Sequence, residues 1–281
     1  MYCYSKSNIG YSHIKTGTPC QDFSLHVLEK DGRIIIAACD GHGGKQYIRS
    51  DMGSLFASIA VRKVFEKVSY DMLKEGSEAF LKKVRLSLLC EWNDQVDRHL
   101  KDNPFKEDEL KPLDDKQRKV LAEYPEKAYG TTLNGAMLLK DKLLLAKIGD
   151  GESLRVVRKE LISNFNEEDE PVANFTYSMC QDDTFDHLHC KVLDANGIDG
   201  IFLCTDGVIN PYQNISSFNN NLILPLMKEL LTSKSTDFID NYIEDLGMNK
   251  GIGDDVSLAF IIPDEIDGSI YLKKDDSKNS D

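Results

Sequence analysis

The stretch RIIIAACDGHGG, Arg33–Gly44, decides the fold of this chain because a fully apolar run ends abruptly at a carboxylate. Ile34–Cys39 lacks the polar alternation of a half-exposed strand, which predicts a β-strand buried on both faces. Asp40 and His42 follow at once among three glycines, which permit a tight turn. The stretch is typical either of a metal ligand or catalytic acid mounted on a rigid element, or of an ordinary buried strand that ends in an Asp-Gly turn.

A second strand is predicted to pair with this one. Phe23–Leu28 and Ile34–Cys39 flank a Lys-Asp-Gly turn signal at 30–32, which predicts a β-hairpin. The hairpin brings Asp22, at the start of its first strand, beside Asp40, at the end of its second. Two such carboxylates repel each other unless a positive charge lies between them, and a divalent metal ion is the usual solution.

The composition bounds the function. With 281 residues, of which 41% are hydrophobic, the chain is long enough for one large domain or two small ones. Its 34 basic and 47 acidic side chains give a net charge of −13, which repels nucleic acid and anionic membranes, so neither is an expected partner. No apolar run approaches the roughly 20 residues of a membrane span and the N-terminus lacks signal-peptide features, so we expect a cytoplasmic protein. Seven cysteines without a Cys-x-x-Cys pair predict neither a disulfide nor a zinc site.

The other elements follow from hydrophobic periodicity and turn signals. Helices are expected at 45–67, 77–100, 113–123, 222–231 and 236–246. Further strands are expected at 131–139, at 143–148, at 154–157, within 200–206 and within 251–262. Residues 161–196, which include the charge run NEEDE, fit no regular pattern and are predicted to form an insertion. His187 and His189 within it have a spacing that suits a metal on one face of a strand, or a surface role.

Five acidic residues share one context, because each begins or ends an apolar strand and four of them adjoin a glycine: Asp22, Asp40, Asp150, Asp206 and Asp254. If the strands belong to one sheet system, their ends converge at one edge. An all-oxygen, carboxylate-rich cluster suits Mg²⁺ or Mn²⁺, whereas zinc calls for more His or Cys. Two such ions about 4 Å apart hold a hydroxide and clamp the oxygens of an in-line displacement, which favours phosphate ester hydrolysis.

Six short motifs carry a resemblance to a known family. They are CQD at 20–22, DGHGG at 40–44, YGTTL at 129–133, GDGES at 149–153, TDGV at 205–208 and GDDVS at 253–257. In this order the motifs resemble those of the metal-dependent protein phosphatases of type 2C, the PPM family, and particularly of its bacterial branch. The resemblance extends over residues 20–257 and, through the flanking strands, over nearly the whole chain.

The resemblance implies an α+β fold, a four-layer α-β-β-α sandwich with a central antiparallel β-sandwich flanked by helical pairs. The phosphatase domain would occupy residues 1–263, with a flap-like insertion at about 161–196 that faces the substrate, and residues 264–281 would form a polar C-terminal tail. The implied cofactors are two Mn²⁺ or Mg²⁺ ions and a third, weaker one.

The resemblance also implies roles for individual residues. Asp40 would bridge both metal ions. Asp206 and Asp254 would complete the shell of one ion, and Asp22 and the Gly41 carbonyl would serve the other.

Two further positions receive roles in the same way. Asp150 resembles the position that is associated with the third ion. His42 matches the general acid that protonates the leaving alkoxide, a task that suits an imidazole. Without the resemblance, His42 is equally well read as a hydrogen-bond donor that stabilises the turn.

The chain departs from the family pattern at three positions. Gly17 stands where the family commonly has an Arg that holds the substrate phosphate, and His13 and Lys15 are candidate substitutes without the bidentate fork of Arg. Gln21 stands where many members have Glu. Asn210 stands where many members have another Asp for the third metal.

The predicted function is therefore a metal-dependent serine/threonine protein phosphatase that hydrolyses phosphomonoesters by attack of a metal-bridged hydroxide. Its expected partners are phosphorylated protein substrates and a cognate kinase. Two alternatives remain open at this point: a catalytically weak regulatory or binding member of the same fold, and a small-molecule phosphoesterase.

Overall fold

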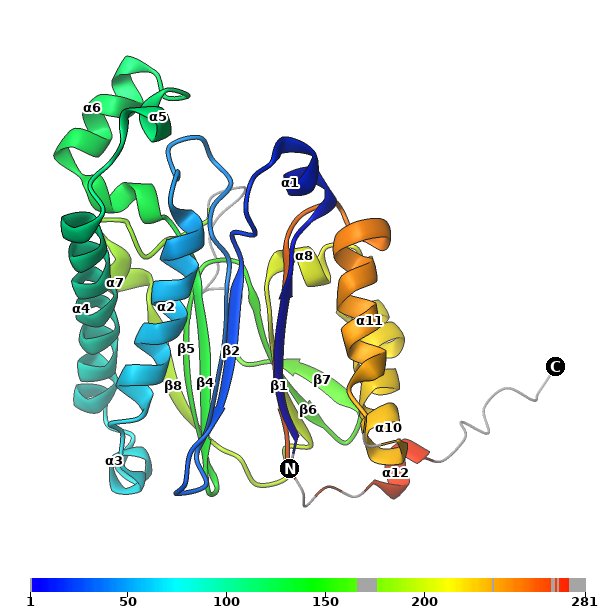
Figure 1. Cartoon of the computed structure of the whole chain (residues 1–281). Helices are drawn as coiled ribbons and strands as arrows, with labels where there is room; N and C mark the ends of the chain where they lie inside the picture. Colours follow the sequence, from blue (N-terminus) through cyan, green and yellow to red (C-terminus); the bar gives the residue numbers. More distant parts are fainter. Residues whose placement is uncertain (1, 166–175, 234, 264–265, 267, 273–281) are drawn as a thin grey trace.

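The computed structural model describes residues 2–165, 176–233, 235–263, 266 and 268–272. Its centre consists of two five-stranded antiparallel sheets that pack face to face (Figure 1). The β10 sheet has the order β1 (Tyr2–Asn8), β10 (Val256–Ile262), β9 (Gly200–Cys204), β6 (Glu152–Val157) and β7 (Glu160–Ser163). The β3 sheet has the order β2 (Phe23–Leu28), β3 (Ile34–Cys39), β4 (Leu133–Leu139), β5 (Lys142–Ile148) and β8 (His189–Asp194).

A pair of longer helices covers the outer face of each sheet. Figure 1 shows α2 (Ser50–Phe65) and α4 (Glu78–Asp102) outside the β3 sheet, and α10 (Leu224–Thr232) and α11 (Asp237–Asp245) outside the β10 sheet. This arrangement confirms the predicted α-β-β-α sandwich. In the part of the chain that the structure describes, no helix is both long and apolar enough to cross a membrane.

The remaining helices lie in the connections and near the C-terminal end of the described chain. They are α1 (Tyr11–Thr16), α3 (Tyr70–Glu75), α5 (Glu107–Leu110), α6 (Asp115–Glu123), the 3₁₀ helix η1 (Pro125–Tyr129), α7 (Thr184–His187), α8 (Asp206–Ile209), α9 (Ile215–Phe218), η3 (Asn219–Ile223), η4 (Leu246–Lys250) and α12 (Ser269–Leu272).

Strand β3 is buried on both faces, as its sequence predicts, because it separates two layers of the core. Ile34, Ile36 and Ala38 face the β10 sheet across the sandwich. Ile35 and Cys39 face the other way and pack beneath α2 and α4. The apolar run therefore serves two cores at once and holds its C-terminal end rigidly in place.

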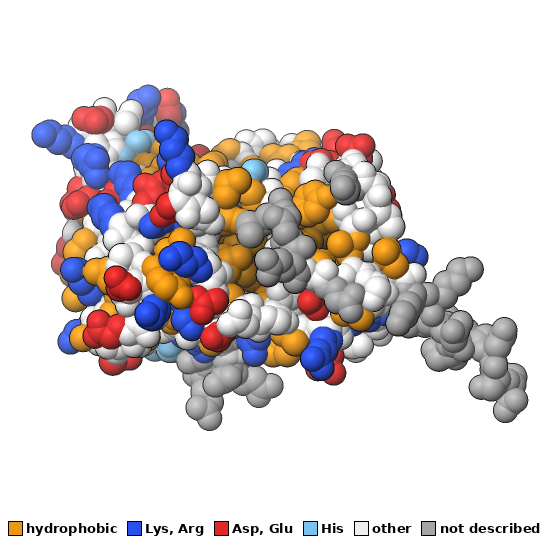
Figure 2. All heavy atoms as spheres, turned by 90° about the horizontal axis from the view of Figure 1, so that it is seen from below, with side chains coloured by type: hydrophobic (Ala, Val, Ile, Leu, Met, Phe, Trp, Pro, Cys, Tyr) orange, Lys and Arg blue, Asp and Glu red, His pale blue; other side chains and the backbone are white. Residues whose placement is uncertain are grey.

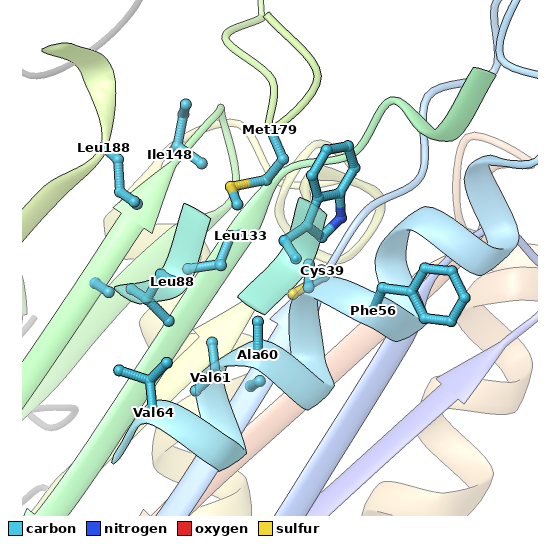
Figure 3. Packing of buried hydrophobic residues seen from close by; sticks show 14 of the residues in the cluster. Cys39, Phe56, Ala60, Val61, Val64, Leu88, Leu133, Ile148, Met179 and Leu188 are labelled. Carbon is cyan, nitrogen blue, oxygen red and sulfur yellow. The ribbon is translucent and has the colours of Figure 1, made fainter. Parts of the chain in front are cut away.

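The helical layer packs closely on the β3 sheet. Figure 3 shows Ala60 and Val61 of α2 and Leu88 of α4 gathered around Cys39. Trp92 of α4 is fully buried, and its Nε1–H donates to the carbonyl of Gly53, 3.1 Å away. The single Trp is thus part of the core.

Several boundaries differ from the predictions. Helix α2 begins at Ser50 and not at 45, because the preceding residues form turns in which the Tyr47 N–H donates to the Gly44 carbonyl. Strand β1 was not predicted, since its half-exposed residues show no clear alternation. Residues 166–175 of the predicted insertion lie outside the described residues, and α7 and β8 occupy most of its second half.

The prediction that His187 and His189 share one face of a strand is wrong. His187 ends α7, whereas His189 begins β8, so the two residues belong to different elements. The His187 ring stacks on Tyr177 at 3.5 Å between centroids, and its Nε2 lies 3.3 Å from a carboxylate oxygen of Asp183. The prediction required both histidines to lie in one strand, where residues two apart point to the same face. The end of α7 lies between them, so their side chains do not share a face in this way.

The packing of α4 on the β3 sheet predicts a large difference between two nearby leucines. Leu88→Ala is expected to reduce the free energy of unfolding by about 2–5 kcal/mol, because Leu88 is completely buried between helix and sheet. Leu86→Ala, two residues earlier, is the control, since Leu86 is 47% exposed, and it should change stability by less than about 1 kcal/mol. Urea denaturation of both variants measures this, and equal losses would contradict the packing.

Candidate active site

The strand registers bring all five predicted carboxylates to one edge of the sandwich. Phe23 pairs with Cys39, which places Asp22 and Asp40 at the same end of the hairpin β2–β3. Cys204, at the end of β9, pairs with residues near the start of both β6 and β10. The neighbouring turns carry the other three carboxylates, Asp150, Asp206 and Asp254. In Figure 1 this is the upper end of the sheets, where α1 and α8 lie.

Asp40 is the electrostatic centre of this edge. Burial raises the pKa of its carboxyl well above the usual range, and the negative charges of four other carboxylates raise it further: Asp22, Asp206, Asp150 and Asp254. A carboxylate that interacts with four others in this way lies among them. The structure therefore brings together the five acidic residues that the sequence singles out.

Burial and neighbouring negative charges also raise the pKa values of Asp22 and Asp206. Burial raises the pKa of Asp22, and hydrogen bonds from Thr205 and Ser257 partly oppose the shift. Burial, followed by the charges of Asp150 and Asp254, raises the pKa of Asp206 to about 6. Each extra negative charge is unfavourable here, so the edge has an unmet demand for positive charge.

The other end of the molecule has a different charge pattern. Figure 2, the view from below, shows acidic side chains interspersed with lysine and arginine, mostly over the side where α3 and α4 lie. Carboxylates with basic neighbours balance locally, whereas those around Asp40 raise one another's pKa values.

The donor set fits hard divalent cations. Asp150 accepts a hydrogen bond from the Thr176 hydroxyl at 2.6 Å through Oδ2, while its Oδ1 is buried without a hydrogen-bond partner. The Oε1 atom of Gln21 is also buried without one. Buried oxygens without donors suit cation binding, since an unpaired acceptor is otherwise costly.

The carboxylates lie close together but are not arranged as a complete set of metal ligands. Within the described ranges, no three His, Cys, Asp or Glu side chains close around a common point as ligands would. Like charges turn their oxygens apart unless a cation lies between them, so the carboxylates can lie close together without converging on one point.

Main-chain contacts hold Asp40 in place. Its N–H donates to the Thr132 hydroxyl at 2.9 Å, and its carbonyl accepts from the Thr132 N–H and the Thr131 hydroxyl, both at 2.8 Å. Gly41 has to be glycine, because a Cβ would lie 2.5 Å from the carbonyl oxygens of Gln21 and Ser50. The turn after β3 is thus rigid at the residue predicted to bridge two metal ions.

Asp255 is a residue that the motif analysis did not assign. Its Oδ1 accepts the Gly10 N–H at 2.7 Å and its Oδ2 accepts the Gln21 N–H at 2.6 Å. The side chain is almost fully buried and fixes the segment that carries Asp22. The Asp254-Asp255 doublet is a usable signal, since one carboxylate faces the cluster and the next one folds inward.

Hydroxyl groups are the second feature missed in the sequence. Thr205 donates through Oγ1 to Asp22 at 2.8 Å and accepts the Ser257 N–H at 2.9 Å. One side chain therefore joins the turn after β9 and the start of β10 to Asp22. Its position directly before Asp206 is the only hint that the sequence contains.

His42 lies beside the cluster. Its N–H donates to the Gly130 carbonyl at 3.0 Å, and its ring lies 5.0 Å from the Tyr47 ring between centroids. Burial lowers the pKa of His42, and the charge of Asp150 acts in the opposite direction. The imidazole is therefore mostly neutral at pH 7, with one ring N–H available as a donor.

The candidate phosphate-binding residues lie on α1 and in different settings. His13 Nδ1 is 2.9 Å from Asp255 Oδ2, within ion-pair distance, and makes no hydrogen bond to the described residues. Lys15 is exposed, with its Nζ 4.3 Å from the centre of the Tyr11 ring. Their predicted contact with a phosphate stays a prediction.

The other departures from the family pattern have clear contacts. Gln21 donates through Nε2 to the Ser50 hydroxyl at 2.6 Å. Asn210 donates through Nδ2 to Asp206 Oδ2 at 3.0 Å, so it supports that carboxylate as a neutral neighbour.

Comparisons with known proteins agree with this geometry. The family model described as protein phosphatase 2C matches residues 9–241. Among solved structures, the chain is similar to PppA, a key regulatory component of T6SS in Pseudomonas aeruginosa, with 17% identity, coverage of 92% of this chain and 96% of that chain, and a TM-score of 0.58.

Two further structures are similar over most of their length. The catalytic domain of the serine threonine protein phosphatase PstP, in complex with two manganese ions, shares 15% identity, with 92% and 96% coverage and a TM-score of 0.57. Stp1 from Staphylococcus aureus shares 12% identity, with 94% and 95% coverage and a TM-score of 0.52. No curated protein matches the sequence.

The fold and the carboxylate edge thus define a protein phosphatase of the metal-dependent class. The chain belongs to the protein phosphatase 2C family, whose model matches it over residues 9–241.

The raised pKa of Asp206 predicts a pH-dependent stability in the absence of divalent metal. From an ordinary value of 3.8 it rises to about 6. Between these two values the folded protein keeps a proton that the unfolded chain has released, so this residue makes stability fall as pH rises through that window. Asp206→Asn should remove this component and stabilise the metal-free protein at pH 7 by roughly 1–2 kcal/mol.

Urea denaturation in a chelating buffer at pH 5 and pH 7 measures the effect. Asp97→Asn, on the exposed surface of α4, is the matched control and should leave the pH dependence unchanged. A parent protein and Asp206→Asn variant with the same pH dependence would contradict the shifted pKa.

Proposed function

We propose that this chain removes phosphate from phosphoserine and phosphothreonine in proteins by using two Mn²⁺ or Mg²⁺ ions at the Asp40 edge. The observation that carries the proposal is that Asp40 lies among four other aspartates from separate turns, whose charges raise its pKa. Ions bound there would supply Lewis-acid charge to the phosphoryl oxygens and lower the pKa of water. Asp22, Asp40, Asp206, Asp254 and the Gly41 carbonyl would hold them.

Asp150 is proposed to contact a third, weaker ion. Its buried Oδ1 lacks a hydrogen-bond donor, which supports this role, and Asp206 and His42 both respond to its charge. Asn210 in place of a carboxylate makes this site less negative and therefore weaker.

His42 is proposed as the general acid. Its backbone is held by Gly130, and a neutral imidazole N–H is available for the oxygen of the departing Ser or Thr side chain. Protonation of that oxygen prevents release of a high-energy alkoxide. His13 and Lys15, on α1 at the same edge, are proposed to contact the substrate phosphate.

The biological setting is proposed on broader grounds. A phosphorylated protein substrate requires a serine/threonine kinase that adds the phosphate. The net charge of −13 supports a cytoplasmic location away from anionic surfaces. A purely regulatory role is not favoured, because Asp22, Asp40, Asp206 and Asp254 are all present at one edge.

Loss of a central carboxylate should abolish turnover. Asp40→Ala and Asp206→Ala are each expected to lower kcat/KM about 100-fold or more, because each removes negative charge that the ions need. Hydrolysis of an aryl phosphate and of a phosphothreonine peptide in Mn²⁺, and again after chelation, measures this. Asp97→Ala is the surface control.

Near-parental activity in either variant would contradict the metal assignment. A parent that binds Mn²⁺ in calorimetry but turns over neither substrate would instead support a regulatory binding protein.

The general-acid role predicts a dependence on the leaving group. His42→Ala should lower kcat about 100-fold for phosphothreonine or an alkyl phosphate, whose alkoxide needs a proton. For an aryl phosphate with a good leaving group the loss should be much smaller. Single-turnover rates on both esters measure the ratio, and equal losses would exclude the acid role.

A further inference from the structure

A hollow of about 460 Å³ lies next to the catalytic turn. Its walls come from the turn at 46–47, from α6, from Lys127 of η1 and from residues 180–181. We call it the Tyr47 hollow. None of the residues given a metal-binding or acid role above lines it.

The hollow is continuous with the catalytic edge through Tyr47. The Tyr47 ring lies 5.0 Å from the His42 ring, and Gly130 packs against both so closely that a Cβ there would clash with each ring. The opposite wall is tied to the same edge, since Met179 donates to the Thr131 carbonyl at 2.8 Å. A peptide whose phosphate reaches Asp40 would therefore pass close to the hollow.

The hollow has an apolar floor. Tyr47, Val120 of α6 and Cys180 contribute to it, and Cys180 is only 5% exposed. An aliphatic or aromatic side chain would bury its surface here at a gain of about 25 cal/mol per Å².

Two lysines mark its margin. Lys116 is exposed on the first turns of α6, and Lys127 has its Nζ 4.6 Å from the Tyr124 ring centre and 3.9 Å from an Asp182 oxygen. The acidic lining residue, Asp114, is engaged in capping α6, where its Oδ1 accepts the Gln117 N–H at 2.8 Å. In a chain with a net charge of −13, this margin favours an acidic ligand group.

The wall formed by α6 is firmly mounted. Arg49, at the start of α2, donates to both Glu109 oxygens at 2.8 and 3.0 Å and to the Asn103 carbonyl at 2.7 Å. The same guanidinium donates to the Tyr129 hydroxyl at 2.7 Å. Residues 103–109 are thus anchored to the start of α2, and Arg118 of α6 donates to a Glu107 oxygen at 2.8 Å, which ties α6 to this anchored segment.

We propose that the Tyr47 hollow binds the part of a phosphoprotein substrate that adjoins the phosphorylated residue, with an apolar side chain on the floor and an acidic side chain at Lys116 and Lys127. The inference rests on the proposed phosphatase function. It assigns substrate preference to α6 and to the turn at 46–47.

Charge exchange tests the hollow. The probes are fluorescent phosphothreonine peptides with a Leu-Glu pair before or after the phosphothreonine, and otherwise identical peptides with Leu-Lys or Ser-Ser. Lys116→Glu is expected to weaken Leu-Glu binding about 5-fold and to favour Leu-Lys, a reversal that a structural role would not produce. Lys119→Glu, on the same helix but outside the hollow, is the control.

Fluorescence anisotropy in Mn²⁺ measures binding, and kcat/KM is measured on the same peptides and on an aryl phosphate too small to reach α6. For the parent, Leu-Glu should bind about tenfold more tightly than Ser-Ser on at least one side of the phosphothreonine. The aryl phosphate should be unaffected by Lys116→Glu.

Equal binding of all three peptides by the parent, or no change in preference with Lys116→Glu, would overturn the proposal. Peptide binding that depends on Lys116 without hydrolysis of any substrate would support the hollow and refute the proposed activity instead. The two failures are therefore distinguishable.

Discussion

Repulsion among the carboxylates at the end of the sandwich is the constraint on which this structure depends. Burial raises the pKa of Asp40, and the charges of four other aspartates raise it further. Such a cluster persists only if the surrounding structure is stable enough to hold it. The two sheets, with a helical pair on each outer face, supply that stability from cores on both sides of β3.

Hydrogen bonds just outside the cluster hold the carboxylates in place against their mutual repulsion. Thr132 and Thr131 hold the main chain of Asp40, Thr205 binds Asp22, and the buried Asp255 fixes the turn that carries Asp22. These groups leave oxygens of Asp150 and Gln21 without donors. The arrangement keeps the carboxylates in place while retaining free acceptors, which is what a site for hard cations requires.

The residues of the candidate site could be predicted because strand ends and turns are local features of a sequence. Each of the five aspartates follows or precedes an apolar strand, often with a glycine beside it. Asp255 and Thr205 could not be assigned in the same way, since their roles arise from contacts with Gly10, Gln21 and Asp22 in distant parts of the chain. Strand β1 escaped prediction because its pairing with β10, and not its own alternation, makes it a strand.

The sequence by itself determined the strand that ends at Asp40, the hairpin that sets Asp22 beside it, and the order of the acidic turns. Alternation, apolar runs and glycines act over a few residues and are therefore readable along the chain. Only the tertiary structure decided that five turns meet at one edge, and that α6 and Tyr47 enclose a hollow beside His42. Strand register and the ion pair of Arg49 with Glu109 join residues far apart in sequence, and no local pattern encodes them.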